Sequence, residues 1–283
     1  MLHLLLLSSL PKPPPLVLVM GALDPTGSDG ITADAVTCAM FGCHALTAAT
    51  AITVQDTANL EDVHPLAPEL LDDQARCLLE DMPVQAIKVD GVYSTEVASA
   101  IAQVAADYTQ VPMVLHLGAQ PMSGGTPADL DDAEDLLAAT FELLIPQAHV
   151  VVVDYAQLNR WIADGHLQIE GLATPMHAFV AAGANWVLTL GAPLRPGHTA
   201  HTLIGGSGAT AQWPSRAVAD RPGATDRSGP IGGAVSIALT ALLARGLSVP
   251  DAVEQALVHG ESAAETAFAA GMGRRISNRT KNA

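Results

Sequence analysis

Hydrophobic positions along the chain follow two patterns that alternate. Short continuous apolar runs, rich in β-branched residues, predict buried strands, and longer stretches with helical spacing predict helices between them. The predicted strands cover residues 16–20, 45–53, 86–89, 113–117, 150–153 and 186–190. The predicted helices cover residues 30–41, 67–80, 95–108, 128–144 and 174–182. Continuous apolar strands that alternate with helices are typical of a parallel sheet covered on both faces, so we expect an α/β fold.

The last third of the chain departs from this alternation. Residues 199–214 hold two short runs around Gly205-Gly206-Ser207-Gly208, which predict a β-hairpin; a nucleotide-binding loop is the alternative. Two closing helices are expected at 231–245 and 249–270. We see no repeat and no dividing linker. We therefore expect one domain over residues 16–271, a disordered leader over 1–15, and a frayed basic tail over 272–283.

Composition narrows the classes of function. The chain has 29 acidic and 13 basic residues, a net charge of -16, which disfavours nucleic-acid backbones and anionic membranes as partners. Its acidity fits either a salt-rich cytoplasm or a GC-rich genome. Cys38, Cys43 and Cys77 have no CxxC spacing, and the leucine-rich start lacks a basic region, so we expect a cytoplasmic protein. His198 and His201 predict a solvent-exposed loop pair rather than a zinc site, and no metal ligands are expected.

The segment from Gly21 to Asp34, G-A-L-D-P-T-G-S-D-G-I-T-A-D, carries the most chemistry. It follows a predicted strand and opens a helix, which is where α/β folds bind ligands. Gly27 and Gly30 permit tight turns and close approach of the backbone. Asp34 lies one turn into the helix, where a carboxylate can face a pocket. Taken alone, the segment also fits an ordinary turn before a helix.

This segment resembles the A-G-[ST]-D-P-[ST]-G-G-A-G-I-Q-A-D motif of the hydroxymethylpyrimidine/phosphomethylpyrimidine kinases of thiamine biosynthesis, in the ribokinase-like superfamily. Residues 48–57, A-A-T-A-I-T-V-Q-D-T, are similar to that family's I-T-A-L-T-A-Q-N-T, and similarity continues to about residue 270. The resemblance implies a three-layer ribokinase-like fold with a central, mostly parallel sheet. It also implies ATP and Mg²⁺, a small pyrimidine alcohol as substrate, and a homodimer.

The resemblance assigns binding of the pyrimidine to Ala22, Asp24, Asp34 and Gln55. A glutamine amide offers a donor and an acceptor that match a ring nitrogen and its exocyclic amine. A buried aspartate can accept a hydrogen bond from the hydroxymethyl group. For Gln55, the alternative is a polar residue that ends a strand.

The residues for phosphoryl transfer differ from the family pattern. The family's T-H-G-T-G-C motif aligns with residues 228–233, so Gly233 occupies the position of the cysteine that has the catalytic role, while Pro230 removes a backbone donor. The amides of Gly232 and Gly233 remain as an anion hole at a helix N-terminus. Three further family residues are replaced: an aspartate by His116, a magnesium-linked glutamate by Gln157 and a phosphate-facing lysine by Leu190.

These replacements predict that phosphoryl transfer is weak or lost. Asp154 or Asp226 could act as a substitute base and Arg227 as a phosphate ligand; the alternative is that all three are solvated loop charges. Three functions stay open: a working kinase, a non-catalytic relative that binds a pyrimidine, and a superfamily kinase with a different vitamin-like alcohol as substrate.

Overall fold

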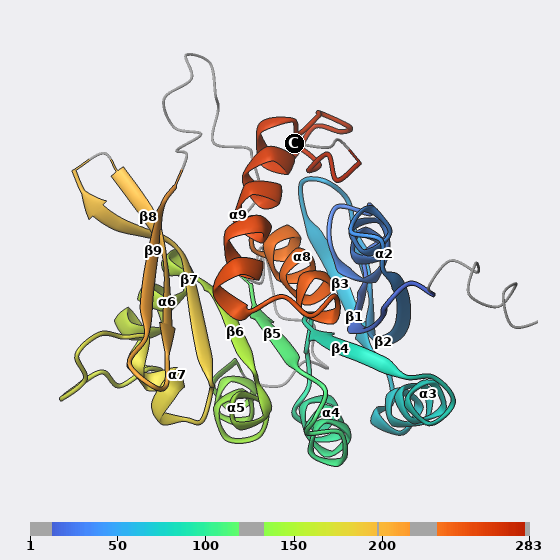
Figure 1. The fold of residues 1–283 in the computed structure, drawn as a ribbon. Helices are drawn as coiled ribbons and strands as arrows, with labels where there is room; N and C mark the ends of the chain where they lie inside the picture. The colour runs from blue at the N-terminus through green and yellow to red at the C-terminus, as the bar shows by residue number, and fades with distance from the viewer. Residues whose placement is uncertain (1–12, 119–132, 197, 216–230, 281–283) are drawn as a thin grey trace, which may run out of the picture.

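The computed structural model describes residues 13–118, 133–196, 198–215 and 231–280. Its centre is a nine-stranded sheet in the order β3-β2-β1-β4-β5-β6-β7-β8-β9 (Figure 1). The strands are β1 Leu16–Leu23, β2 His44–Gln55, β3 Leu60–Pro65, β4 Val84–Val89, β5 Met113–Leu117, β6 Val150–Asp154, β7 Trp186–Arg195, β8 His198–Gly205 and β9 Thr210–Pro214. The helices are α2 Gly30–Met40, α3 Pro68–Asp81, α4 Thr95–Asp107, α5 Ala133–Ala139, α6 Tyr155–Ala163, α7 His177–Ala181, α8 Gly232–Ala244 and α9 Val249–Glu265.

Six neighbouring strands of the sheet run parallel to one another: β2, β1, β4, β5, β6 and β7. Strands β3, β8 and β9 pair antiparallel at the edges. The register of β1 on β2 runs from Leu16 opposite His44 and shifts at an irregularity between Gly21 and Leu23, after which Leu23 pairs with Ile52. The carboxyl ends of the parallel strands meet at one edge of the sheet. The predicted α/β fold is confirmed, and so is the predicted hairpin, which β8 and β9 form.

Helices cover both faces of the sheet, which gives three layers. In Figure 1, α3, α4 and α5 lie on one face, and α2, α8 and α9 lie on the other. Alternate residues of β1 divide between the faces: Leu18 and Met20 pack in the core with α3 and α4, and Val17 and Val19 pack with α8. Helix α8 is almost entirely apolar, as expected for a helix buried among the sheet, α2 and α9; the hydroxyls of Ser236 and Thr240 bond to carbonyls of the same helix.

Some elements differ from the prediction. Strand β3 was missed because its sequence, L-E-D-V-H-P, is polar; an edge strand tolerates charges and proline. Helix α6 was missed because it begins directly after β6, with no intervening turn signal. Of the helix predicted over 128–144, residues 128–132 lie outside the described ranges, and α5 gives way to a π-helical turn, Thr140–Leu144, and a 3₁₀ turn, Ile145–Gln147.

The histidine pair is also not the exposed loop pair that was expected. Both residues lie on β8, and His201 is buried, with Nε2 at 3.3 Å from Oε1 of Glu261. The leader expected over residues 1–15 falls mostly outside the described residues, which begin at Pro13. Within the described ranges, no helix is long and apolar enough to cross a lipid bilayer.

Candidate functional site

The loop that joins β1 to α2 is organised by the carboxylate of Asp24. It accepts hydrogen bonds from the backbone N–H groups of Thr26 and Asp29, at 2.7 and 3.0 Å. The hydroxyl of Ser28 donates to it at 2.8 Å. Burial raises the pKa of Asp24, but hydrogen bonds from the Gln55 amide and the loop hydroxyls outweigh burial and lower the pKa below its ordinary value. Asp24 is therefore an ionised carboxylate that fixes the loop from inside.

The loop returns to the sheet at Gly30, the first residue of α2. Gly30 has a φ of +67°, and a Cβ there would lie 2.2 Å from the carbonyl oxygen of Ala22. Only glycine allows this approach. The contact holds the start of α2 against the end of β1, where Ala22 packs with Ala51 and Val63.

One turn into α2, Asp34 enters a buried cluster of charges. Its Oδ2 lies 2.5 Å from Nζ of Lys88, and the same ammonium contacts Oδ2 of Asp90. Asp34 and Lys88 have no exposed surface, and Asp90 is 7% exposed. Buried charges are tolerated only when they are paired. Two carboxylates on one lysine leave excess negative charge, which calls for a second cation.

The charges set one another's protonation. Burial lowers the pKa of Lys88, but the two carboxylates raise it by more than burial lowers it. The pKa is therefore above its ordinary value and the ammonium stays charged. Burial raises the pKa of Asp90, and Lys88 with His116 outweighs this and lowers it. At Asp34 burial dominates, and it raises the pKa to about 7. Asp34 is therefore the member of the cluster that takes up a proton first as the pH falls.

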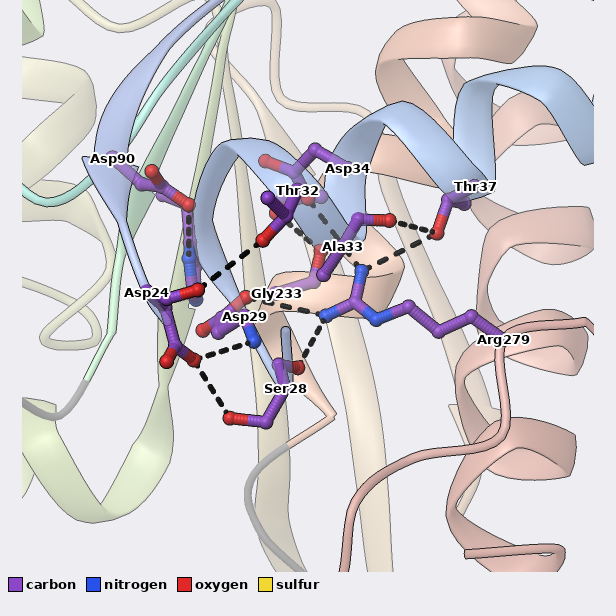
Figure 2. Close-up of polar contacts among 12 residues, drawn as sticks. Asp24, Ser28, Asp29, Thr32, Ala33, Asp34, Thr37, Asp90, Gly233 and Arg279 are labelled. Carbon is purple, nitrogen blue, oxygen red and sulfur yellow. Dashed lines mark hydrogen bonds and ion pairs between the residues drawn. The ribbon is translucent and has the colours of Figure 1, made fainter. Parts of the chain in front are cut away.

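The second cation comes from the far end of the chain. Arg279 donates through Nη1 to Oδ1 of Asp34 at 3.5 Å and to the hydroxyl of Thr37 at 3.3 Å. Its Nη2 donates to the carbonyl oxygen of Ser28 and to Oδ1 of Asp29, both at 3.2 Å. Figure 2 shows the guanidinium between α2 and the loop that precedes it. One side chain therefore ties this loop to the helix.

The prediction of a frayed tail over residues 272–283 is therefore wrong for the part that the structure describes, which reaches residue 280. Arg279 is only 6% exposed, and the backbone N–H of Arg274 donates to the carbonyl oxygen of Thr57 at 2.7 Å. The physical reason is electrostatic: the tail supplies the cation that the buried carboxylates need.

The N-terminus of α8 lies beside this cluster. A Cβ at Gly233 would lie 2.2 Å from Oδ1 of Asp29, and a Cβ at Gly232 would lie 2.5 Å from Nε2 of His116. Side chains from two other elements therefore occupy the space that these glycines leave open. The helix dipole and free backbone amides make such a terminus favourable for anions.

Beyond α8, the ends of β5, β6 and β7 carry polar groups of a different kind. Seven buried side-chain atoms find no hydrogen-bond partner among the described residues. Four of them lie here, namely Nε2 of His116, Oδ2 of Asp154, Oε1 of Gln157 and Oγ1 of Thr189; the others belong to Asp90, His259 and Arg279. Burial raises the pKa of Asp154, against an opposing effect from His116. Asp154 is thus partly buried at the start of α6, and it is not the solvated loop charge of the alternative interpretation. Leu190 is buried in the apolar core.

The structure brings some predicted residues together and not others. Gln55 lies near enough to Asp24 to help lower its pKa, and Ala22 lies two residues before Asp24 at the end of β1. Asp34 has no exposed surface, because Lys88 and Arg279 enclose its carboxylate. It therefore does not reach a ligand in this conformation. Asp226, Arg227 and Pro230 lie outside the described residues.

Sequence reasoning missed the roles of Asp29, Lys88, Asp90 and Arg279. The signal for Lys88 was present, since a lysine in the continuous apolar run A-I-K-V must find a buried partner. No local pattern marked Arg279, because its partners lie about 250 positions earlier.

Comparisons with known proteins agree with this architecture. The family model described as phosphomethylpyrimidine kinase matches residues 24–278. A hydroxymethylpyrimidine/phosphomethylpyrimidine kinase of Mycobacterium tuberculosis is 29% identical over 241 residues, which are 85% of each protein.

Solved structures share the fold. The ADP complex of Bacillus subtilis pyridoxal kinase superposes with a TM-score of 0.76 at 20% identity, over 94% of this chain and 98% of the kinase. A phosphomethylpyrimidine kinase from Clostridium difficile superposes with a TM-score of 0.65 at 21% identity, over 86% of this chain and 97% of that one.

Proposed function

The chain belongs to the phosphomethylpyrimidine kinase family, and from this membership we propose that it binds a hydroxymethylpyrimidine-like alcohol and phosphorylates it slowly with ATP. In this proposal Ala22, Asp24 and Gln55 bind the alcohol. The backbone amides of Gly232 and Gly233 at the N-terminus of α8 bind the phosphoryl group while it is transferred to the alcohol.

The observation that carries the proposal is the continuous set of contacts from Gln55 to α8. Gln55 lies near enough to Asp24 to help lower its pKa, Asp24 accepts from the backbone N–H of Asp29, and the Asp29 carboxylate lies against Gly233. A ring held at Gln55 and a phosphate held at α8 are thus served by one rigid loop. Such a kinase needs an amide that hydrogen-bonds to the ring and a helix terminus that binds the anion.

The low rate follows from the charges. Phosphoryl transfer depends on positioning and on neutralising the charge on the phosphate oxygens. Leu190 and Gln157 carry no charge, and the cations of Lys88 and Arg279 are engaged by carboxylates. The amides of α8 and the dipole of that helix remain to stabilise the transferred group.

A metal ion held by the protein is not part of the proposal. Among the described residues, no group of three His, Cys, Asp or Glu side chains is arranged to hold one. Mg²⁺ commonly binds through substrate phosphates with only one or two protein carboxylates. We derive no step through a protein-bound metal, and any Mg²⁺ belongs to the ATP substrate.

Calorimetry tests the pocket. Wild-type protein is titrated with hydroxymethylpyrimidine and, separately, with pyridoxal, the alternative vitamin-like alcohol. Gln55→Ala removes a partner from a buried polar contact worth ~1–3 kcal/mol, so affinity is expected to fall roughly 10- to 100-fold. The control is Gln103→Ala on the exposed side of α4, which should bind like wild type. Absence of heat with folded wild-type protein contradicts the pocket.

A coupled assay for ADP tests the rate. We expect turnover well below ~1 s⁻¹, the lower end of common enzymes. Turnover within the common range contradicts the proposed slow rate. Binding with no ADP formation at all favours a second candidate function, a non-catalytic pyrimidine-binding protein, to which the uncharged Leu190 and Gln157 also point.

A further inference from the structure

Asp29 stands out because it is an N-cap residue that does not cap its own helix. Aspartate is favoured at this position because its carboxylate bonds to the first backbone N–H groups of the helix. Here Asp29 precedes α2 in extended conformation and makes no such bond. Its side chain points instead to the first turn of a different helix, α8, where Oδ1 lies against Gly233. Figure 2 shows Asp29 and Gly233 side by side.

The contacts of Asp29 fix its carboxylate without burying it. Its backbone N–H donates to Asp24 at 3.0 Å, and Nη2 of Arg279 donates to its Oδ1 at 3.2 Å. Even so, 52% of its side chain is exposed. The other carboxylates of the cluster are closed off, because Asp24 and Asp90 are nearly buried and Asp34 is fully so. Asp29 is thus the most exposed carboxylate of these four, and the one most open to a substrate.

A second observation points to the same position. On the other side of the first turn of α8, the buried ring of His116 directs Nε2 at Gly232, and that nitrogen has no hydrogen-bond partner among the described residues. A buried polar atom without a partner marks a place where a ligand or water completes the bonding. The start of α8 is therefore flanked by a fixed carboxylate and by an unused imidazole nitrogen.

We infer that Asp29 is the catalytic base of this site, an inference that rests on the proposed function. Asp29 accepts the proton of the substrate alcohol while the alcohol oxygen forms its bond to the γ-phosphorus of a nucleoside triphosphate. The bond from that phosphorus to the bridging oxygen breaks, and the nucleoside diphosphate leaves with the electron pair. Asp29 then releases its proton to water.

The kinetic test compares wild type with Asp29→Asn, which keeps the size of the side chain and removes its basicity. Loss of a general base lowers rates ~10²–10⁴-fold, so we expect kcat to fall by that factor while KM for the alcohol stays within about twofold. Asp29→Glu keeps the charge near Arg279 but displaces the oxygens, and it should lower kcat roughly tenfold or more. The control is Asp164→Asn, which makes the same change of charge at the exposed end of α6 and should leave the rate unchanged.

A structural test needs no activity. Gly233→Ala alone should lower the melting temperature, because its Cβ overlaps Oδ1 of Asp29, although alanine is the better helix former. In the Asp29→Ala background the same change should cost nothing or stabilise. Gly232→Ala faces His116 and is the control: its cost should be the same in both backgrounds.

The outcomes separate the two proposals. Wild-type turnover that Asp29→Asn leaves unchanged overturns the assignment of Asp29 and leaves the proposed kinase intact. Binding without any wild-type turnover overturns both the kinase and its base. If Gly233→Ala lowers the melting temperature equally in both backgrounds, the Asp29 carboxylate does not lie against α8. This result overturns the inference without any activity measurement.

Discussion

At the ends of β1 and β4, buried charges are joined by ion pairs, with only Oδ1 of Asp90 and Nε of Arg279 unpartnered among the described residues, whereas at the ends of β5, β6 and β7 the buried polar groups form no such network. Asp34, Asp90, Lys88 and Arg279 form one connected network. His116, Asp154, Gln157 and Thr189 each keep an atom without a partner among the described residues. The first group lies with the loop that holds Asp24, and the second lies on β5, β6, β7 and the first turn of α6.

The first region contributes mainly to stability, and the second has more unpartnered groups that can bind a ligand. A network of paired charges holds a loop in place and has few groups left to offer a ligand; here they are Oδ1 of Asp90 and Nε of Arg279. Atoms without partners carry a cost of desolvation that a ligand or water removes on binding. We therefore expect removal of charge to destabilise the first region and to be tolerated, or to stabilise, in the second.

The largest expected effect is that of Lys88→Met. It leaves Asp34 and Asp90 buried without their shared cation, and breaking a buried pair costs ~3–5 kcal/mol of unfolding free energy. Urea denaturation measures the loss. Arg76→Met is the control, since its pairs with Asp72 and Asp107 lie at the surface and contribute less than about 1 kcal/mol.

Adding Asp34→Asn to Lys88→Met should restore part of the lost stability, because it removes one unpaired carboxylate. A loss at Lys88 no larger than the loss at Arg76 contradicts the view that this network holds the first region together.

A smaller loss is expected for Arg279→Ala. The guanidinium makes four hydrogen bonds to α2 and its preceding loop, and removal of a partner from buried polar groups costs ~1–3 kcal/mol. The same denaturation assay measures it. Arg274→Ala is the matched control, because it lies in the same segment with an exposed side chain and should change stability by less than ~0.5 kcal/mol. Equal effects at the two positions contradict the contacts of Arg279.

The smallest effect has the opposite sign and belongs to the second region. Burial raises the pKa of Asp154 in the folded chain above its value in the unfolded chain. The contribution of Asp154 protonation to the unfolding free energy is therefore fully present below the pKa of the unfolded chain. It is lost as the pH rises through the pKa of the folded chain. Asp154→Asn should raise the unfolding free energy at pH 7 by more than the ~0.5 kcal/mol scatter of neutral substitutions.

The gain from Asp154→Asn should shrink as the pH falls toward 4, where wild-type Asp154 is increasingly protonated. Denaturation at several pH values measures this trend, with Asp164→Asn as the exposed control. A gain that does not depend on pH has a cause other than the buried charge.

Much of the fold could be predicted from the sequence, because most of the parallel strands contain a short apolar run that indicates burial. Strand β3 and helix α6 were missed where that local signal is weak: β3 is a polar edge strand, and α6 follows β6 without a turn. Tertiary pairing, not local preference, decides such elements.

The site was only partly predictable. The turn at Asp24 and the strand end at Gln55 carry local patterns, and the structure places these two side chains together. Asp34 has the right sequence context for a pocket, yet Lys88 and Arg279 enclose it. Pairing between residues so distant in the sequence leaves no periodicity or spacing that a single sequence can report.

The contact between Arg279 and Ser28 also orders events during synthesis. These residues are separated by 251 positions, and translation proceeds at ~5–20 residues per second, so about 10 to 50 seconds pass between their additions. Throughout that interval the nascent chain has the loop before α2 but not the guanidinium that fixes it. Chains truncated just before residue 279 carry every strand and helix of the described residues and still lack the clamp on Asp29. The site is thus completed only after every strand and helix named above has been synthesised.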